Sequence, residues 1–269
     1  MDQPDLFLPT ISDVRTRDIR DLMSHNWFAL GSKYKRTEPI HHQIGRNWVR
    51  IRGTEEFGIA TVYDQDLLLF LISNLQEQLD RGFSIQTRDQ LFNIYDFAKF
   101  RGVSAGKISG GHYQDIKAAL QRLTSTTVET TMRGDGWGIF PLLAGATQRD
   151  RDTIKGPRFD VQYFRVQLPP FIFDAVVKER QVLSFSRDYF SLRGMLRRFL
   201  FLYARKSIGN NKNAWKEPLT TFMPKTATLS SRKEFRRQIR TITEKPILNY
   251  TVSINEDDNI VFKVHRKRK

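Results

Sequence analysis

The stretch SSRKEFRRQIRTIT, residues 230–243, decides the fold of the carboxyl-terminal part of the chain. Three apolar residues, Phe235, Ile239 and Ile242, recur at helical spacing and form one stripe. A serine at the start can cap a helix by accepting a hydrogen bond from a backbone N–H of the first turn. We therefore expect an amphipathic helix over residues 231–243, with five basic side chains on its outer face: Arg232, Lys233, Arg236, Arg237 and Arg240.

The basic face of this helix indicates a partner of opposite charge. Like charges at i, i+4 spacing destabilise an isolated helix by about a few tenths of a kcal/mol per pair, so a purely structural helix would alternate Glu and Lys. Arginine can also pair with both acceptors of guanine or hold a phosphate with two hydrogen bonds. The alternative is a solvated surface helix. We predict a recognition helix for the major groove, with DNA-binding residues Ser230, Ser231, Arg232, Lys233, Arg236, Arg237 and Arg240.

The segments around this helix predict a winged helix. A long helix over residues 191–207 and a short one over residues 217–226 precede it. Alternating apolar residues over 250–254 and 260–264, on both sides of a turn at 255–259, predict a hairpin wing. The turn contains three consecutive acidic residues, which phosphates would repel. We therefore expect the wing tip to point away from DNA or to lie beyond it.

The first half of the chain shows the same plan. A strongly apolar helix follows Asp64, and a second helix starts near Tyr113. The latter carries a weaker set of candidate DNA contacts: Gln114, Lys117, Gln121 and Arg122. Two strand-like runs, residues 126–132 and 137–143, flank an Asp-Gly turn and predict a hairpin, which we assign as the first wing.

The fold class expected from these patterns is α+β, with two tandem winged-helix domains. We expect a flexible arm over residues 1–25, with a short leading helix as the alternative. The amino-terminal winged helix then covers residues 26–180 and makes a secondary DNA contact. The carboxyl-terminal winged helix, the main DNA reader, covers residues 181–269.

The charge distribution agrees with a polyanion partner. The net charge of the chain is +15, and residues 187–269 hold 20 of its 44 basic and 7 of its 29 acidic side chains. Nearly all of the excess positive charge therefore belongs to the carboxyl-terminal third. Such asymmetry is typical of a surface that neutralises phosphates and releases counterions.

Several other function classes are disfavoured by the sequence. The chain has no cysteine, which removes disulfides and thiolate metal sites. It contains no phosphate-binding G-x-x-x-x-G-K-[ST] run and no G-x-S-x-G elbow. The adjacent His41 and His42 would point to opposite faces of a strand, so we interpret them as a surface feature and not a metal chelate. We expect no enzyme activity, cofactor, metal or membrane segment, and a cytoplasmic location.

Four segments resemble one known family, the plasmid replication initiator protein A family: YDQDLLLFLISNLQEQL, GGHYQDIKAALQRLTSTTVET, QVLSFSRDYFSLRGMLRRFLFLYARKSIG and SSRKEFRRQIRTI. The resemblance spans residues 25–265. It implies a tandem winged-helix initiator that binds repeated origin sequences (iterons) in double-stranded DNA and helps open the origin. It also implies a bacterial protein associated with the nucleoid or a plasmid, and host partners, the initiator ATPase and the replicative helicase. A homodimer formed through the first domain, residues 26–180, would repress its own gene.

Two alternatives remain open at this point. A dimeric winged-helix transcription repressor without a replication role would use the same modules. An RNA-binding or nucleoid-packaging protein would need exposed aromatic stacking platforms. Most aromatic residues lie on apolar stripes, which disfavours the second class. Directly repeated sites beside the gene would favour initiation, whereas one inverted repeat would favour repression.

Overall fold

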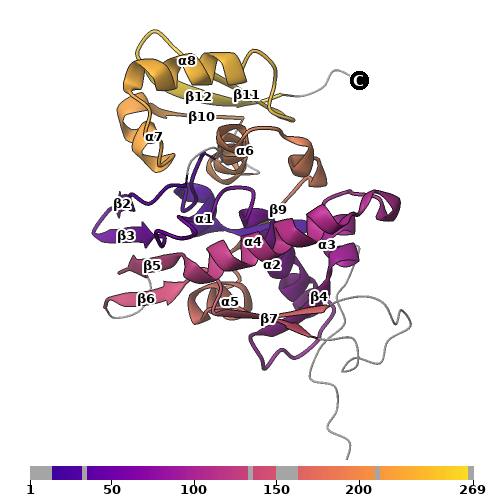
Figure 1. Cartoon of the computed structure of the whole chain (residues 1–269). Helices are drawn as coiled ribbons and strands as arrows, with labels where there is room; N and C mark the ends of the chain where they lie inside the picture. Colours follow the sequence, from indigo (N-terminus) through magenta and orange to yellow (C-terminus); the bar gives the residue numbers. More distant parts are fainter. Residues whose placement is uncertain (1–13, 32–34, 133–135, 150–162, 210–212, 266–269) are drawn as a thin grey trace, which may run out of the picture.

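The computed structural model describes residues 14–31, 35–132, 136–149, 163–209 and 213–265 (Figure 1). Within these residues the chain is a mixed α and β protein whose helices pack against small antiparallel sheets. One order of elements occurs twice, apart from β5 and β6, which lie between the helix pair and the last two strands of the first set: a long helix, a strand, two helices and two strands. We call these two sets the first and the second unit.

The first unit is built around α2, whose residues 67–72 are all buried. This agrees with the sequence, in which the helix has almost no polar face. Two antiparallel strands, β7 and β8, come later in the chain and form a sheet with β4, in which β8 lies between β4 and β7. The elements are α2 (Gln65–Asp80), β4 (Asp89–Asn93), α3 (Ile94–Phe100), η1 (Ala105–Lys107), α4 (Gly110–Ser125), β7 (Gly145–Arg149) and β8 (Tyr163–Gln167).

The second unit repeats this arrangement. Its long helix α6 is buried along most of its length, and β12 lies between β10 and β11, as β8 does in the first unit. The elements are α6 (Met195–Ile208), β10 (Ala214–Pro218), α7 (Leu219–Lys225), α8 (Arg232–Ile242), β11 (Tyr250–Ile254) and β12 (Asn259–Val264). The repeat inferred from the sequence is therefore present in the structure.

The hairpin of β5 (Thr127–Thr130) and β6 (Gly138–Pro141) is real, but our assignment of it as the first wing is wrong. It joins β2 (Ile40–Ile44) and β3 (Asn47–Arg52) in a separate sheet of order β2-β3-β5-β6. The reason is burial across the strands, since Val128 pairs with Ile51 and both are buried. The strands that correspond in sheet order to β11 and β12 of the second unit are β7 and β8. Gly134 and Asp135 of the predicted turn lie outside the described residues.

The amino-terminal segment differs from the flexible arm expected over residues 1–25. Residues 1–13 lie outside the described part, but β1 (Thr16–Ile19) and α1 (Arg20–Ser24) are ordered elements. Apolar residues hold them in place, because Ile19, Leu22 and Met23 are buried. β1 pairs with β9 (Val182–Phe185), which lies just beyond the domain boundary that we proposed at residue 180.

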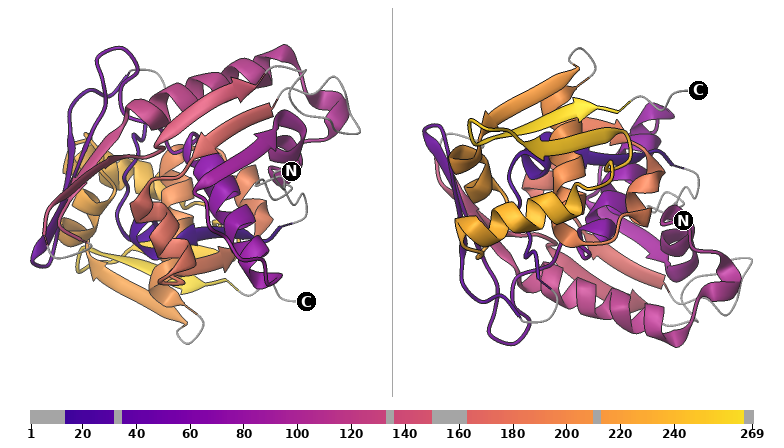
Figure 2. Two further views of the ribbon diagram at one scale, coloured as in Figure 1. Left: turned by 90° about the horizontal axis from the view of Figure 1, so that it is seen from below. Right: turned by 90° about the horizontal axis from the view of Figure 1, so that it is seen from above.

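The two units meet along α6, which lies between the second sheet and the first unit (Figures 1 and 2). A buried ion pair joins them there: Arg198 on α6 contacts Asp66 on α2 at 2.7 Å. Arg198 Nε also donates a hydrogen bond to the Leu192 carbonyl at 3.0 Å. α5 (Pro170–Val177) and η3 (Arg187–Ser191) complete the described elements. No helix in the described ranges is long and apolar enough to cross a bilayer.

Candidate nucleic-acid interface

Helix α8 lies on the outside of the second unit, above the sheet of β10, β11 and β12 (Figure 1). Ser231 begins it, with a side chain that accepts a hydrogen bond from the Glu234 amide at 3.3 Å. Phe235 and Ile239 are fully buried beneath the helix. The Phe235 ring lies 6.4 Å from the ring of Phe222 on α7. The helix and its apolar stripe are therefore as the sequence predicts.

The opposite side of α8 carries the basic residues. Arg232, Lys233, Arg237 and Arg240 are exposed, and Arg236 is partly buried. An open hollow of about 480 Å³ runs along this side. It is lined by Ser231, Lys233, Glu234, Arg236, Arg237 and Arg240. Ser230 lies at the side of the helix start, where its hydroxyl accepts a hydrogen bond from Gln238 at 3.2 Å.

Three of these five cations already have acidic partners. Arg237 makes two hydrogen bonds with Glu234, at 2.7 and 2.8 Å, and these hold the pKa of Glu234 down, at about 2. Arg232 and Arg236 both pair with Asp258, the latter at 2.7 Å. Lys233 and Arg240 have no ion pair among the described residues. The sequence predicted one uniform basic face, whereas the structure divides it into paired and unpaired cations.

The acidic turn lies partly against α8. Glu256 and Asp257 are exposed, but the carboxylate of Asp258 reaches the start of α8. Attraction to the two arginines, which the sequence argument did not consider, holds this carboxylate at the helix. The expectation that the turn points away from DNA or lies beyond it stays a prediction.

The candidate residues on α4 fall into two groups. Gln114, Lys117 and Gln121 are exposed along the helix. Arg122 instead forms a two-fold hydrogen-bonded pair with Asp64, with both N···O distances at 2.7 Å. This contact raises the pKa of the guanidinium further and fixes its position. The structure therefore gives Arg122 a partner within the protein. The other three candidates on α4 carry one positive charge, that of Lys117.

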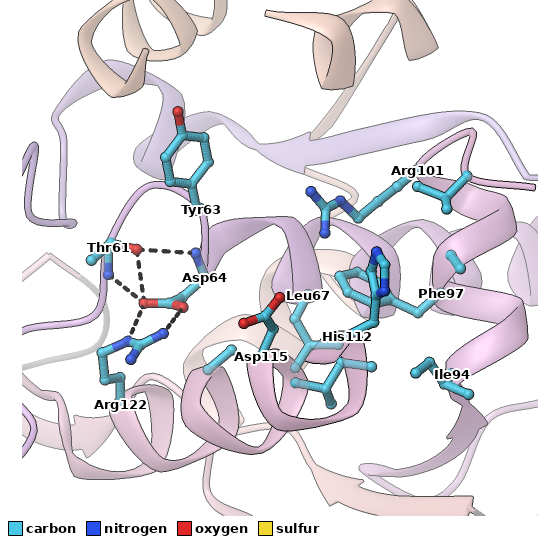
Figure 3. A pocket seen from close by; sticks show the side chains of 14 residues that line it. Thr61, Tyr63, Asp64, Leu67, Ile94, Phe97, Arg101, His112, Asp115 and Arg122 are labelled. Atoms are coloured by element: carbon cyan, nitrogen blue, oxygen red, sulfur yellow. Dashed lines mark hydrogen bonds and ion pairs between the residues drawn. The ribbon is translucent and has the colours of Figure 1, made fainter. Parts of the chain in front are cut away.

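A cavity of about 220 Å³ lies beside this pair, between α2, α3 and α4 (Figure 3). Asp64 lies at its wall and accepts hydrogen bonds from both Arg122 and the Thr61 amide. Asp64 precedes α2, but its side chain bonds no amide of that helix. Apolar residues of the three helices form much of the lining, and the cavity lies away from α8.

The histidine pair does not form a metal site in the described residues, which contain no group of three or more potential metal ligands. Our surface interpretation is correct for His41, which is exposed, and wrong for His42, which is 4% exposed. The ring of His42 is hydrogen-bonded to the Asn26 carbonyl at 2.7 Å. Burial lowers its pKa, so this side chain belongs to the packed interior.

Sequence reasoning missed the roles of two charged residues, one beside the basic face of α8 and one buried between the two units. Asp258 lies among other acidic residues in a turn, and nothing in the sequence distinguishes it from its neighbours. Arg198 lies in a run of basic and apolar residues, where helical spacing does not predict a buried charge. The sequence gives one partial indication of this ion pair. Asp66 is an acidic residue inside a strongly apolar helix, and a buried carboxylate needs a partner.

Comparison with known proteins identifies a family for most of the chain. The family model described as "Replication initiator protein A" matches residues 17–252. A protein of Wigglesworthia glossinidia brevipalpis, provisionally named a replication protein, is 27% identical over 247 residues, which are 89% of this chain and 85% of that protein. Two crystal structures of domains 2 and 3 of RctB are similar in fold. The first has a TM-score of 0.62 at 15% identity over 92% of this chain and 99% of the other. The second has a TM-score of 0.53 at 14% identity, over 89% and 95%.

Proposed function

Because the chain belongs to the replication initiator protein A family, we propose that it acts at a plasmid origin by binding repeated duplex sites through α8. The observation that carries the proposal is the geometry of this helix. Its apolar stripe is anchored in the second unit, and its five cations face outward beside a hairpin. A helix held in this way can enter the major groove while its basic residues meet bases and phosphates.

We interpret both units as winged helices, since each has a long helix, a strand, a helix pair and a two-stranded hairpin. In such modules the second helix of the pair enters the groove, which is α4 in the first unit and α8 in the second. The two helices differ in whether their cations have acidic partners within the protein. Arg122 on α4 is held by Asp64, whereas Lys233 and Arg240 on α8 have no described ion pair. We therefore propose α8 as the main reader and α4 as a weaker second contact.

Roles along α8 should differ by position. Residues near the start of a recognition helix reach base edges more often, and those further along more often meet the backbone. We propose that Arg232 and Lys233 read sequence and that Arg240 contacts phosphate. The protein acts as a binding protein in this proposal, without a catalytic step of its own.

Family membership also supports finer proposals about partners. Initiators of this kind bring in the host initiator ATPase and the replicative helicase, and they form homodimers when they repress their own gene. We propose the same partners for this chain. They would act at an origin opened by the bound protein in the bacterial cytoplasm.

Footprinting of the full chain on the DNA that flanks its gene tests the proposal. We expect several protected direct repeats, each covering about two helical turns, or roughly 20 base pairs. The Arg240→Ala variant should weaken protection. Arg193→Ala removes the same charge from an exposed position outside α8 and should not. One protected inverted repeat would favour a repressor instead, and no protected site would contradict the proposal.

A further inference from the structure

The turn between β11 and β12 holds Asp258 in a fixed position beside α8. Its backbone adopts φ of 60°, in the left-handed region that Asp and Asn tolerate better than most residues. The Asp258 carbonyl accepts a hydrogen bond from the Leu219 amide at 2.9 Å, and its own amide donates to the Asn255 carbonyl at 3.2 Å. The side chain is therefore directed by a turn that is tied to the start of α7.

From this position one carboxylate engages two arginines of α8. Arg232 and Arg236 lie one helical turn apart, and each approaches a different oxygen of Asp258. The carboxylate side chain is 22% exposed, whereas those of the two arginines are 53% and 33% exposed. The arginines are thus accessible to DNA while they are paired, so contact with a base does not require the pair to open.

The pairing affects phosphates and bases differently. A phosphate would have to approach a carboxylate of the same sign, or the arginines would have to leave Asp258 to reach it. A guanine edge carries no net charge, and the planar arginine fork can bond to it while another N–H remains with the carboxylate. Asp258 should therefore penalise backbone contacts more than base contacts.

We propose that Asp258 is a specificity-determining residue: it positions Arg232 and Arg236 for base edges and restrains them from phosphates. The inference rests on the proposed function, because it assumes that α8 faces duplex DNA. Its consequence is that the acidic turn lowers affinity for DNA of arbitrary sequence and so widens the preference for the cognate site.

The test compares Asp258→Asn with Asp257→Asn in the full chain. Asn keeps the size of the side chain and tolerates the left-handed backbone, so the turn is preserved. Asp257 is exposed, one residue away, and makes no ion pair with α8 among the described residues, and its replacement removes the same charge. The probes are a duplex that the wild-type protein selects from a random pool, and the unselected pool itself. Affinities are measured at several salt concentrations, with thermal melts of each variant.

We expect Asp258→Asn to bind the unselected pool about fivefold more tightly than the wild type, from the release of two partly exposed ion pairs. Its affinity for the pool should also depend more steeply on salt concentration. The increase should correspond to nearly two phosphate contacts, each worth about 0.9 decade of affinity per decade of salt. Affinity for the selected duplex should rise less or fall. Asp257→Asn should change binding to the pool by about twofold or less, because its charge is screened.

Each other result overturns the inference. Equal effects of the two variants would mean that only net charge matters. An equal gain on both probes for Asp258→Asn would mean simple competition with DNA and no effect on selectivity. If the wild type selects no duplex at all, the proposed function fails with the inference. If the wild type selects a duplex and Asp258→Asn behaves like Asp257→Asn, the inference alone fails.

Discussion

Replacement of Arg198 by Met should strongly destabilise the protein. Arg198 is 2% exposed and Asp66 is fully buried, and their contact joins α6 to α2. The guanidinium also donates hydrogen bonds to the carbonyls of Leu192 and Phe190. Methionine fills much of the same volume but leaves the carboxylate and both carbonyls without this partner.

Removal of one member of a buried ion pair costs about 3 to 5 kcal/mol, because the other charge remains buried. Two features of the site place the expected loss of stability in Arg198→Met in the lower part of that range. Arg101 Nε lies 3.2 Å from Asp66 and can hold part of its charge. Burial also raises the pKa of Asp66, so its carboxyl can take up a proton more easily. We expect a loss of about 3 kcal/mol.

Urea denaturation followed by tryptophan fluorescence measures this loss. Arg193→Met is the matched control, since Arg193 is exposed just before α6 and its replacement should change the unfolding free energy by less than about 0.5 kcal/mol. The double variant with Asp66→Asn should recover part of the loss, because no uncompensated charge is then buried. A loss below about 1 kcal/mol for Arg198→Met would refute the assignment of the pair as a stabilising contact between the units.

Three further predictions concern individual side chains. Phe235→Ala should destabilise the second unit by about 3 to 5 kcal/mol, because a fully buried ring is lost, and thermal melts will show whether DNA binding falls only through unfolding. Burial raises the pKa of Asp18 from 3.8 to about 8, so its contribution to stability is present at low pH and is lost as pH rises through this interval. Asp18→Asn should remove that part of the pH dependence. The check is the unfolding free energy, measured with urea from pH 5 to 9. If it changes with pH in Asp18→Asn as it does in the wild type, the prediction is contradicted. Arg240→Ala should weaken binding to cognate and random duplexes alike and lower the salt slope by about one contact, and unequal losses would argue against a phosphate contact.

The sequence predicts local structure well where one period dominates. The 3.6-residue spacing of Phe235 and Ile239 defines α8, and the alternation over 250–254 and 260–264 defines its hairpin. The hairpin of β5 and β6 is also visible from its turn residues. Its place in a sheet is not, since a turn signal is local, whereas the choice of β3 as a partner depends on segments about 80 residues apart.

The charged groups of the interface are less predictable for the same reason. Arg122 and Arg240 look alike in sequence, as polar residues on the outer side of amphipathic helices. The structure pairs the first with Asp64 and leaves the second without a described ion pair. Which cations remain available for DNA is decided by acidic residues from distant segments, such as Asp258 in the turn beyond α8.

Competition binding of α8 variants tests the central proposal most directly. Arg232→Ala and Lys233→Ala, each first shown to be folded by thermal melting, are compared with the wild type on the selected duplex and on random duplex DNA. The proposal predicts that each variant loses about 1 to 3 kcal/mol on the selected duplex and little on random DNA, so that the specificity ratio narrows. Folded variants that both keep the full preference of the wild type would contradict the assignment of α8 as the helix that reads the site.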